Sequence, residues 1–181
     1  MSFSGHYMRR LAGLLESLAP ADFDAATDLL RQTGARKGKV LLAGNGASAA
    51  MAAHGAVDLT KVSGIRALTF NEADLITCFA NDFGYEHWVA KALEYYADPQ
   101  DAVVLISSSG RSPNVVNAAH QARRMGLPLL TLSGFAPDNP LRALGTVNLW
   151  VNSDQYNLVE VTHQAWIVAM VDALAGVTIG A

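Results

Sequence analysis

Cysteine, basic runs and long apolar runs are all scarce in this sequence. Cys78 is the one cysteine in 181 residues, which excludes an intrachain disulfide and a thiolate metal cluster and fits a reducing, cytoplasmic setting. The 13 basic residues form no cluster and are outnumbered by 16 acidic ones, so we expect no nucleic-acid partner. No uninterrupted apolar stretch of about 18 residues occurs. The N-terminus lacks the pattern of a signal peptide. We therefore expect no membrane association.

Apolar residues make up 51% of the chain and charged residues only 16%. This composition excludes a disordered segment and provides enough apolar surface for the core of one domain. The low charge content also predicts that other copies of the chain cover part of the surface, as in a homo-oligomer. Cys78 falls in an apolar helical stretch, so we expect a buried, unreactive thiol.

The apolar pattern changes at residue 39. Before it, residues spaced three and four apart predict helices over 3–18 and 21–34. After it, short apolar runs alternate with helical segments. Strands are predicted at 39–43, 67–70, 102–106, 127–132 and 147–151, with helices at 47–61, 73–80, 84–97, from Ser112-Pro113, and at 157–175. This alternation predicts an α/β fold, a five-stranded parallel doubly wound sheet behind an N-terminal helical pair.

Two small polar loops follow predicted strands, at 44–48 and 107–112. Ligands of such sheets bind beyond the carboxyl ends of the strands. The second loop precedes a helix, whose first N–H groups attract anions. Its hydroxyls, which we predict to bind a phosphate, belong to Ser107, Ser108, Ser109 and Ser112. The alternative is a helix-capping turn, for which one serine would suffice.

The first loop also matches a relaxed dinucleotide fingerprint, Gly44-x-Gly46-x-x-Ala49, with Glu72 as the acidic residue after the second strand. A lone match of this kind is weak evidence. A nucleotide-binding fold has no need of a second phosphate loop, so we expect no nucleotide cofactor. An NAD(P)-dependent oxidoreductase is the least favoured of three hypotheses.

Five segments occur in an order and spacing that resemble a known family. They are Gly44–Ser48, His54 with Asp58-Leu59, Ala80–Tyr85, Ile106–Val115, and Val159-Glu160 with His163. Over about residues 3–175 the chain resembles the sugar isomerase (SIS) domain family, closest to its sedoheptulose 7-phosphate isomerase branch. The resemblance implies a single SIS domain over 1–181. It also implies a sugar-phosphate ligand and a homotetramer with residues 1–36 at the subunit interface.

The resemblance also implies roles for individual residues. The serine loop holds the phosphate, while Asn45, Gly46, Ser48 and Asp82 contact the sugar. Many bacterial relatives carry zinc, whose ligands match His54, Asp58, Glu160 and the residue eight positions further on. That residue is Val168, which cannot bind a metal or move a proton. We therefore expect any zinc ion to bind through His54, Asp58 and Glu160 alone.

The same residues form two pairs on predicted helices. His54 and Asp58 are four apart, and Glu160 and His163 are three apart, so each pair shares a helix face. Each pair alone is more often an ordinary hydrogen-bonded pair. Together they suit an aldose–ketose isomerase that moves a proton through an enediol. Asp58 is then the base that takes the proton from carbon, and Glu160 or His163 transfers protons at the sugar oxygens.

A second hypothesis keeps the phosphate loop without the reaction. Val168 favours a non-catalytic SIS module that binds a sugar phosphate or a protein partner in a regulatory role. Turnover of sedoheptulose 7-phosphate distinguishes the two.

Overall fold

The computed structural model describes residues 2–180 and opens with two helices, α1 (Phe3–Leu15) and α2 (Pro20–Ala35). Strands and helices then alternate. The remaining elements are β1 (Val40–Gly44), α3 (Ala47–Lys61), β2 (Ala67–Thr69), α4 (Ala73–Phe83), α5 (Trp88–Tyr96), β3 (Ala102–Ser107), α6 (Pro113–Arg124), β4 (Leu129–Ser133), β5 (Val147–Trp150) and α7 (Tyr156–Ala175). The predicted alternation is confirmed.

All five strands pair in parallel in the order β2-β1-β3-β4-β5. β1 lies between β2 and β3, and its register with β3 runs from Val40↔Ala102 to Gly44↔Ile106. The chain therefore leaves β1 toward one edge of the sheet, and it later crosses back over β1 to form β3 and continue toward the other edge. The fold is the predicted doubly wound sheet, with its topological switch point at the carboxyl ends of β1 and β3.

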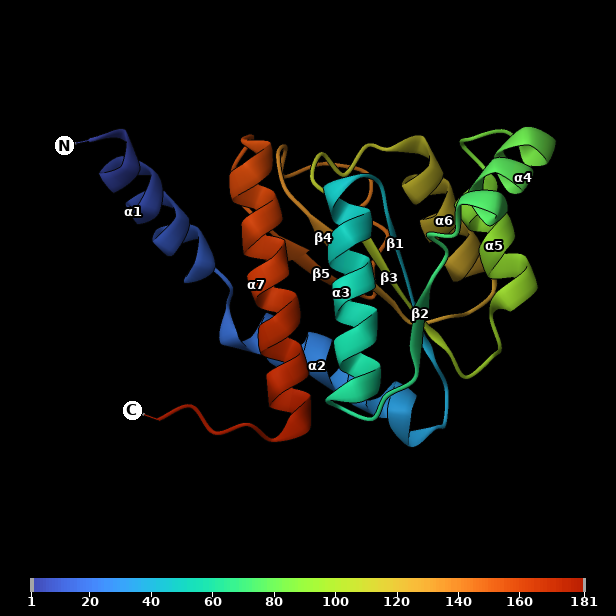
Figure 1. Cartoon of the computed structure of the whole chain (residues 1–181), viewed down its shortest axis with the longest axis horizontal. Helices are drawn as coiled ribbons and strands as arrows, with labels where there is room; N and C mark the ends of the chain where they lie inside the picture. The colour runs from blue at the N-terminus through green and yellow to red at the C-terminus, as the bar shows by residue number, and fades with distance from the viewer. Residues whose placement is uncertain (1, 181) are drawn as a thin grey trace.

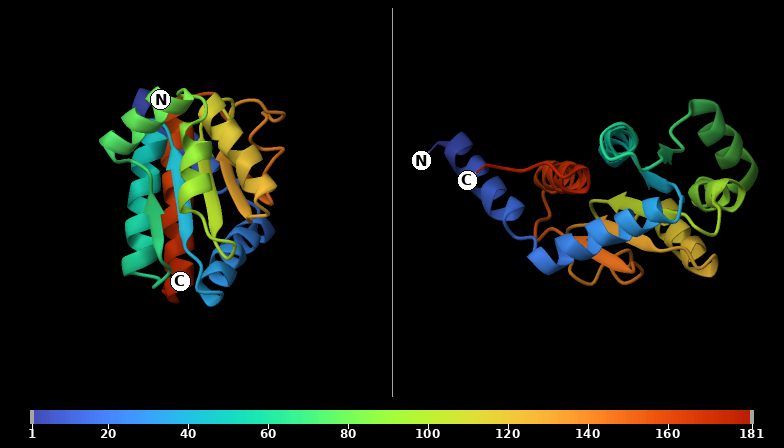
Figure 2. Two further views of the ribbon diagram at one scale, coloured as in Figure 1. Left: turned by 90° about the vertical axis from the view of Figure 1, so that its right-hand side faces the viewer. Right: turned by 90° about the horizontal axis from the view of Figure 1, so that it is seen from below.

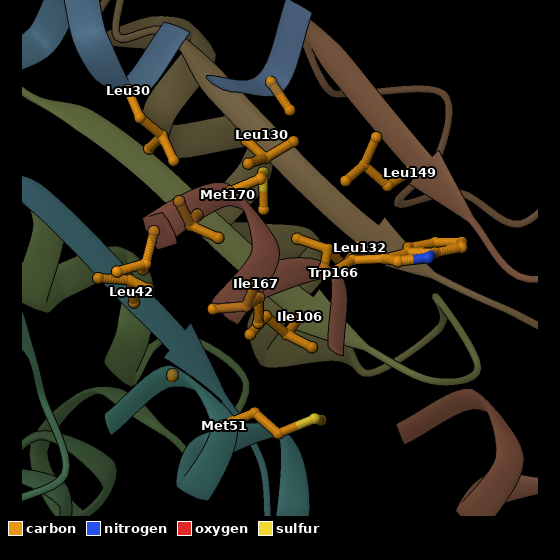
Figure 3. Close-up of a cluster of buried hydrophobic side chains, with 14 of the residues drawn as sticks. Leu30, Leu42, Met51, Ile106, Leu130, Leu132, Leu149, Trp166, Ile167 and Met170 are labelled. Atoms are coloured by element: carbon orange, nitrogen blue, oxygen red, sulfur yellow. The ribbon is translucent and has the colours of Figure 1, made fainter. Parts of the chain in front are cut away.

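Helices cover both faces of the sheet (Figures 1 and 2). Alternate residues of each central strand point to opposite faces, so Leu42 packs with α2, α3 and α7, and Leu41 packs with α5 and α6. Figure 3 shows the first of these clusters, in which Leu130 and Leu132 of β4 meet Ile167 and Met170 of α7. Burying each such side chain stabilises the fold by about 1.5–3 kcal/mol.

The two terminal helices differ in how much of their surface the chain covers. α1 projects from the body beside α7 and buries only Leu14, leaving Phe3 83% exposed and Met8 62% exposed (Figure 1). α7 is long and apolar enough to cross a membrane by length and composition. Its buried residues, among them Trp166 and Ile167, pack into the core of the sheet, as a core helix does.

The prediction for Cys78 is wrong. Its thiol is exposed on α4, a helix without a single fully buried residue. The apolar side chains of α4 pack only partly against the core, because the helix lies at the rim of the sheet above α5.

Candidate functional site

A pocket of about 120 Å³ opens at the carboxyl ends of β1 and β3. This volume is large enough for a phosphate group. Its lining comes from both polar loops and from the start of α7: Asn45, Ser48, Ile106, Ser107, Ser108, Ser109, Ser112, Tyr156 and Glu160. The structure therefore brings together all four serines predicted to bind phosphate.

The serine loop keeps its donors available. Ser112 stands at the N-cap of α6, yet its hydroxyl makes no capping hydrogen bond and instead lies 3.2 Å from the Ser107 hydroxyl. Between residues 2 and 180, the backbone N–H groups of Ser109 and Ser112 donate to no acceptor. Free N–H groups at the start of a helix attract anions. The geometry favours an anion site over the capping turn.

The backbone of this loop is fixed from behind by the segment after β4. Gly134 N–H donates to the Ser108 carbonyl at 2.9 Å, and Leu141 N–H donates to the Gly110 carbonyl at 3.1 Å. Gly110 has a φ of 64°, and a Cβ there would lie 1.9 Å from Oδ1 of the buried Asn139. Only glycine fits this turn, so the loop is rigid before any ligand arrives.

The pocket offers an anion dipoles and no cation. Its lining holds one charged side chain, Glu160, whose Oε1 lies 3.5 Å from the Ser108 hydroxyl. Arg111, in the same loop, is directed toward Asp138 at 3.8 Å and stays exposed. A phosphate held here would therefore depend on hydroxyls, N–H groups and the helix α6 dipole.

Glu160 also lines a larger hollow of about 380 Å³ between α3 and α7. His54 of α3 and Gln164 of α7 face each other there, with His54 Nδ1 3.2 Å from Gln164 Nε2. His54 Nε2 lies 2.9 Å from Asp58 Oδ2. The serine-loop pocket and this groove thus share Glu160, whereas Asp58 lines neither of them and reaches the groove only through its contact with His54.

The predicted zinc ligands do not complete a metal site. In the described part of the chain, no three histidine, cysteine or acidic side chains come close enough together to hold a metal ion. His54 has Asp58 and Gln164 against its two ring nitrogens, and Val168 offers no donor. These residues do not fit the four-coordinate site that zinc prefers.

His163 lies outside the pocket, although it was predicted to act on the substrate. Its side chain is fully buried, with Nε2 donating to the Ser133 carbonyl at 3.1 Å. Burial lowers the pKa of His163 to about 4, despite the opposing effect of that hydrogen bond. The imidazole is therefore neutral at pH 7, and it supports the end of β4 behind the serine loop.

The four predicted sugar contacts separate into two groups. Asn45 and Ser48 line the pocket, and Gly46 stands beside them as the N-cap of α3 with a φ of 55°. Asp82 lies on α4, exposed, in a separate hollow with Phe79 and three other aromatic residues. The chain by itself does not bring Asp82 to the phosphate pocket.

The sequence analysis missed several residues of the site. Gln164 follows Glu160 by four positions, so helical spacing could have placed it on the same face. Tyr156, which stacks edge-on against Phe135 with ring centroids 4.8 Å apart, gives no signal in the sequence. Asn114 could not be anticipated either, because its partner, Asn45, is 69 residues away.

Comparison with known proteins agrees with this geometry. The SIS domain family matches residues 6–134, which is most of the chain. The chain belongs to the SIS family. A phosphoheptose isomerase of Helicobacter pylori is 31% identical over 172 residues, covering 92% of this chain and 86% of its own.

Solved structures give the same result for the SIS fold. The phosphoheptose isomerase of Neisseria gonorrhoeae superposes with a TM-score of 0.87 and 26% identity, over 96% of this chain and 97% of its own. That of Francisella tularensis superposes with a TM-score of 0.85 at 20% identity, over 96% of each chain, and supports the fold alone.

We predict that the serine loop binds phosphate through its hydroxyls. Ser109→Ala should weaken binding of a sugar phosphate by about 1.5–3 kcal/mol, the range for a hydrogen bond to a charged group. Titration calorimetry measures this. Ser63→Ala is the matched control, because the Ser63 hydroxyl donates to the Val171 carbonyl, away from the pocket. Unchanged affinity in the double variant Ser107→Ala/Ser109→Ala would refute the assignment.

We predict that His163 makes the fold sensitive to acid. Its pKa is lowered in the folded state, so between about pH 6.5 and 4 the unfolded chain binds a proton that the folded chain does not. Its contribution to stability is therefore complete above pH 6.5 and declines by up to about 3 kcal/mol as the pH falls to 4. Urea unfolding at pH 7 and pH 4.5 should show a smaller loss in His163→Gln. An equal loss in both proteins would contradict the prediction.

Proposed function

We propose that this SIS protein is an aldose–ketose isomerase that interconverts sedoheptulose 7-phosphate and a manno-heptose 7-phosphate through an enediol. The observation that carries the proposal is that the serine-loop pocket and the groove between α3 and α7 share Glu160. The names of the H. pylori and N. gonorrhoeae relatives support the same substrate. The one cysteine, exposed and unpaired, fits a cytoplasmic enzyme.

The size of the site suits a phosphorylated sugar in its extended form. His54 follows Ser48 by six residues on α3, so it lies about 9 Å further along the helix axis. A sugar whose phosphate occupies the serine loop would extend past Glu160 toward His54 and Asp58. Its carbonyl end, several bonds from the phosphate, would then lie beside the carboxylates. Phosphate binding would supply the energy that holds the chain in this orientation.

The reaction needs one base and one group that handles oxygen-bound protons. Asp58, held 2.9 Å from His54, takes a proton from the carbon next to the carbonyl. The electron pair left behind forms the carbon–carbon double bond of the enediolate, whose negative charge lies on the former carbonyl oxygen. Glu160 transfers a proton from the neighbouring hydroxyl to that oxygen, so the charge passes to the neighbouring oxygen. As that oxygen becomes the new carbonyl, the double bond takes back the proton of Asp58 at the former carbonyl carbon, and nothing is oxidised or reduced overall.

In this proposal His163 positions the serine loop from behind and does not touch the substrate. The proposed steps are assigned to the two carboxylates, since no three histidine, cysteine or acidic side chains come together in the described part of the chain. Activity should accordingly persist after exhaustive chelation.

The test is turnover of sedoheptulose 7-phosphate by Asp58→Asn. Removing the general base should lower kcat by about 10²–10⁴-fold, while binding of the sugar phosphate changes little. Asp172→Asn, at an exposed position on the same helix as Glu160, is the matched control. Full activity in Asp58→Asn would exclude it as the base, and activity abolished by chelation would instead support a metal-dependent reaction.

A second candidate function is a non-catalytic module that senses a sugar phosphate. Val168 favours it, because valine can neither bind a metal nor move a proton at a position where the resemblance implies a zinc ligand. Sugar phosphate binding with no turnover, before and after addition of zinc, would establish this alternative.

We also propose that the chain forms a homotetramer in which residues 1–36 pack against other copies. The exposed apolar residues of α1 and the low charge content support this assembly. Light scattering at micromolar concentration should give about four times the 19.2 kDa chain mass. A mass near 19.2 kDa would refute it.

A further inference from the structure

The two loops of the phosphate pocket are joined by a reciprocal pair of amide side chains. Asn45 follows β1, and Asn114 lies in the first turn of α6, where only 1% of it is exposed. Asn45 Nδ2 donates to Asn114 Oδ1 at 2.9 Å, and Asn114 Nδ2 donates to Asn45 Oδ1 at 2.8 Å. The pair fixes the plane of the Asn45 amide relative to the serine loop.

A third group meets the same amide. Tyr85, in the turn between α4 and α5, donates its hydroxyl proton to Asn45 Oδ1 at 3.2 Å. An amide oxygen has two lone pairs, and Asn114 and Tyr85 occupy both. The Asn45 amide nitrogen has two N–H groups, of which Asn114 takes one. A single N–H donor of Asn45 is left for a ligand in the pocket that Asn45 lines.

We propose that Asn114 and Tyr85 are positioning residues, which hold Asn45 so that its remaining N–H donates to an oxygen of the sugar. This inference rests on the proposed function, since it concerns the same pocket. It adds that the ligand presents an acceptor, a hydroxyl or carbonyl oxygen, to Asn45. Neither Asn114 nor Tyr85 lines the pocket. Both act through Asn45.

Fixing this amide has a physical benefit. Asn45 stands between Gly44 and Gly46, the latter with a φ of 55°, so its loop has more backbone freedom than most. A side chain that is already oriented loses less conformational entropy when it binds its ligand. Removal of either partner should therefore weaken binding of the sugar without disturbing the phosphate contacts.

A double-mutant cycle tests the proposal. Affinities for sedoheptulose 7-phosphate and for inorganic phosphate are measured for Asn45→Ala, Asn114→Ala and the double variant. Each single variant should bind the sugar phosphate on the order of tenfold more weakly. The double variant should be no weaker than Asn45→Ala, because Asn114 acts only through Asn45. Inorganic phosphate should bind all three equally.

The control is Gln121→Ala, which removes a buried amide further along α6 whose oxygen accepts a hydrogen bond from Arg124. It should leave both affinities unchanged. Additive losses in the double variant would overturn the proposal, and so would weaker binding of inorganic phosphate to Asn114→Ala. The second result would mean that Asn114 supports the serine loop instead.

Tyr85→Phe keeps the test decisive if Asn114→Ala does not fold, because Tyr85 is exposed and loses only its hydroxyl. It should weaken sugar phosphate binding a few-fold in the natural background and not at all with Asn45→Ala. An equal loss in both backgrounds would overturn the role of Tyr85. If the unmodified protein binds inorganic phosphate but no sugar phosphate, the proposed function itself fails.

Discussion

The pairing of β1 with β3 determines where every part of the site lies. Their register ends at Gly44↔Ile106, so the chain turns away from both strands at the same edge of the sheet. The Asn45 loop and the serine loop must therefore lie side by side, although more than 60 residues separate them. The reciprocal amide pair between Asn45 and Asn114 forms because of this adjacency. A different strand order would separate the donors and leave no pocket.

The proposed site has two ends. At the sheet edge, hydroxyls and N–H groups of the serine loop line a pocket that has no cation among its lining residues. Glu160 lines both this pocket and the groove between α3 and α7, and Asp58 follows further along α3, beside the place proposed for the reacting carbons. The distance between the serine loop and Asp58 would let the binding energy of the phosphate end orient the reacting end.

Local patterns in the sequence were sufficient to predict the fold and to place the four serines of the loop at one strand end. Apolar strands alternating with helices define a parallel sheet, and Ser107–Ser112 lies in one continuous segment at a strand end. Properties that depend on distant segments were not predictable. His163 shares a helix face with Glu160, but its side chain is buried and hydrogen-bonds the Ser133 carbonyl on β4, a contact that helical spacing does not reveal. Cys78 belongs to an apolar helix that the sheet is too narrow to cover. Asp82 shows the same limit, since it lines a separate hollow with aromatic residues of α4 and α5.

The central claim is that a sugar phosphate lies with its phosphate in the serine loop and its carbonyl end in the groove between α3 and α7. The most direct measurement is a crystal structure of Asp58→Asn soaked with sedoheptulose 7-phosphate, in which turnover is suppressed. The account predicts phosphate density against Ser107, Ser109 and Ser112, with the carbon chain passing Glu160 toward His54. Density for the sugar running instead toward Asp82 and the aromatic residues of α4 and α5 would contradict it.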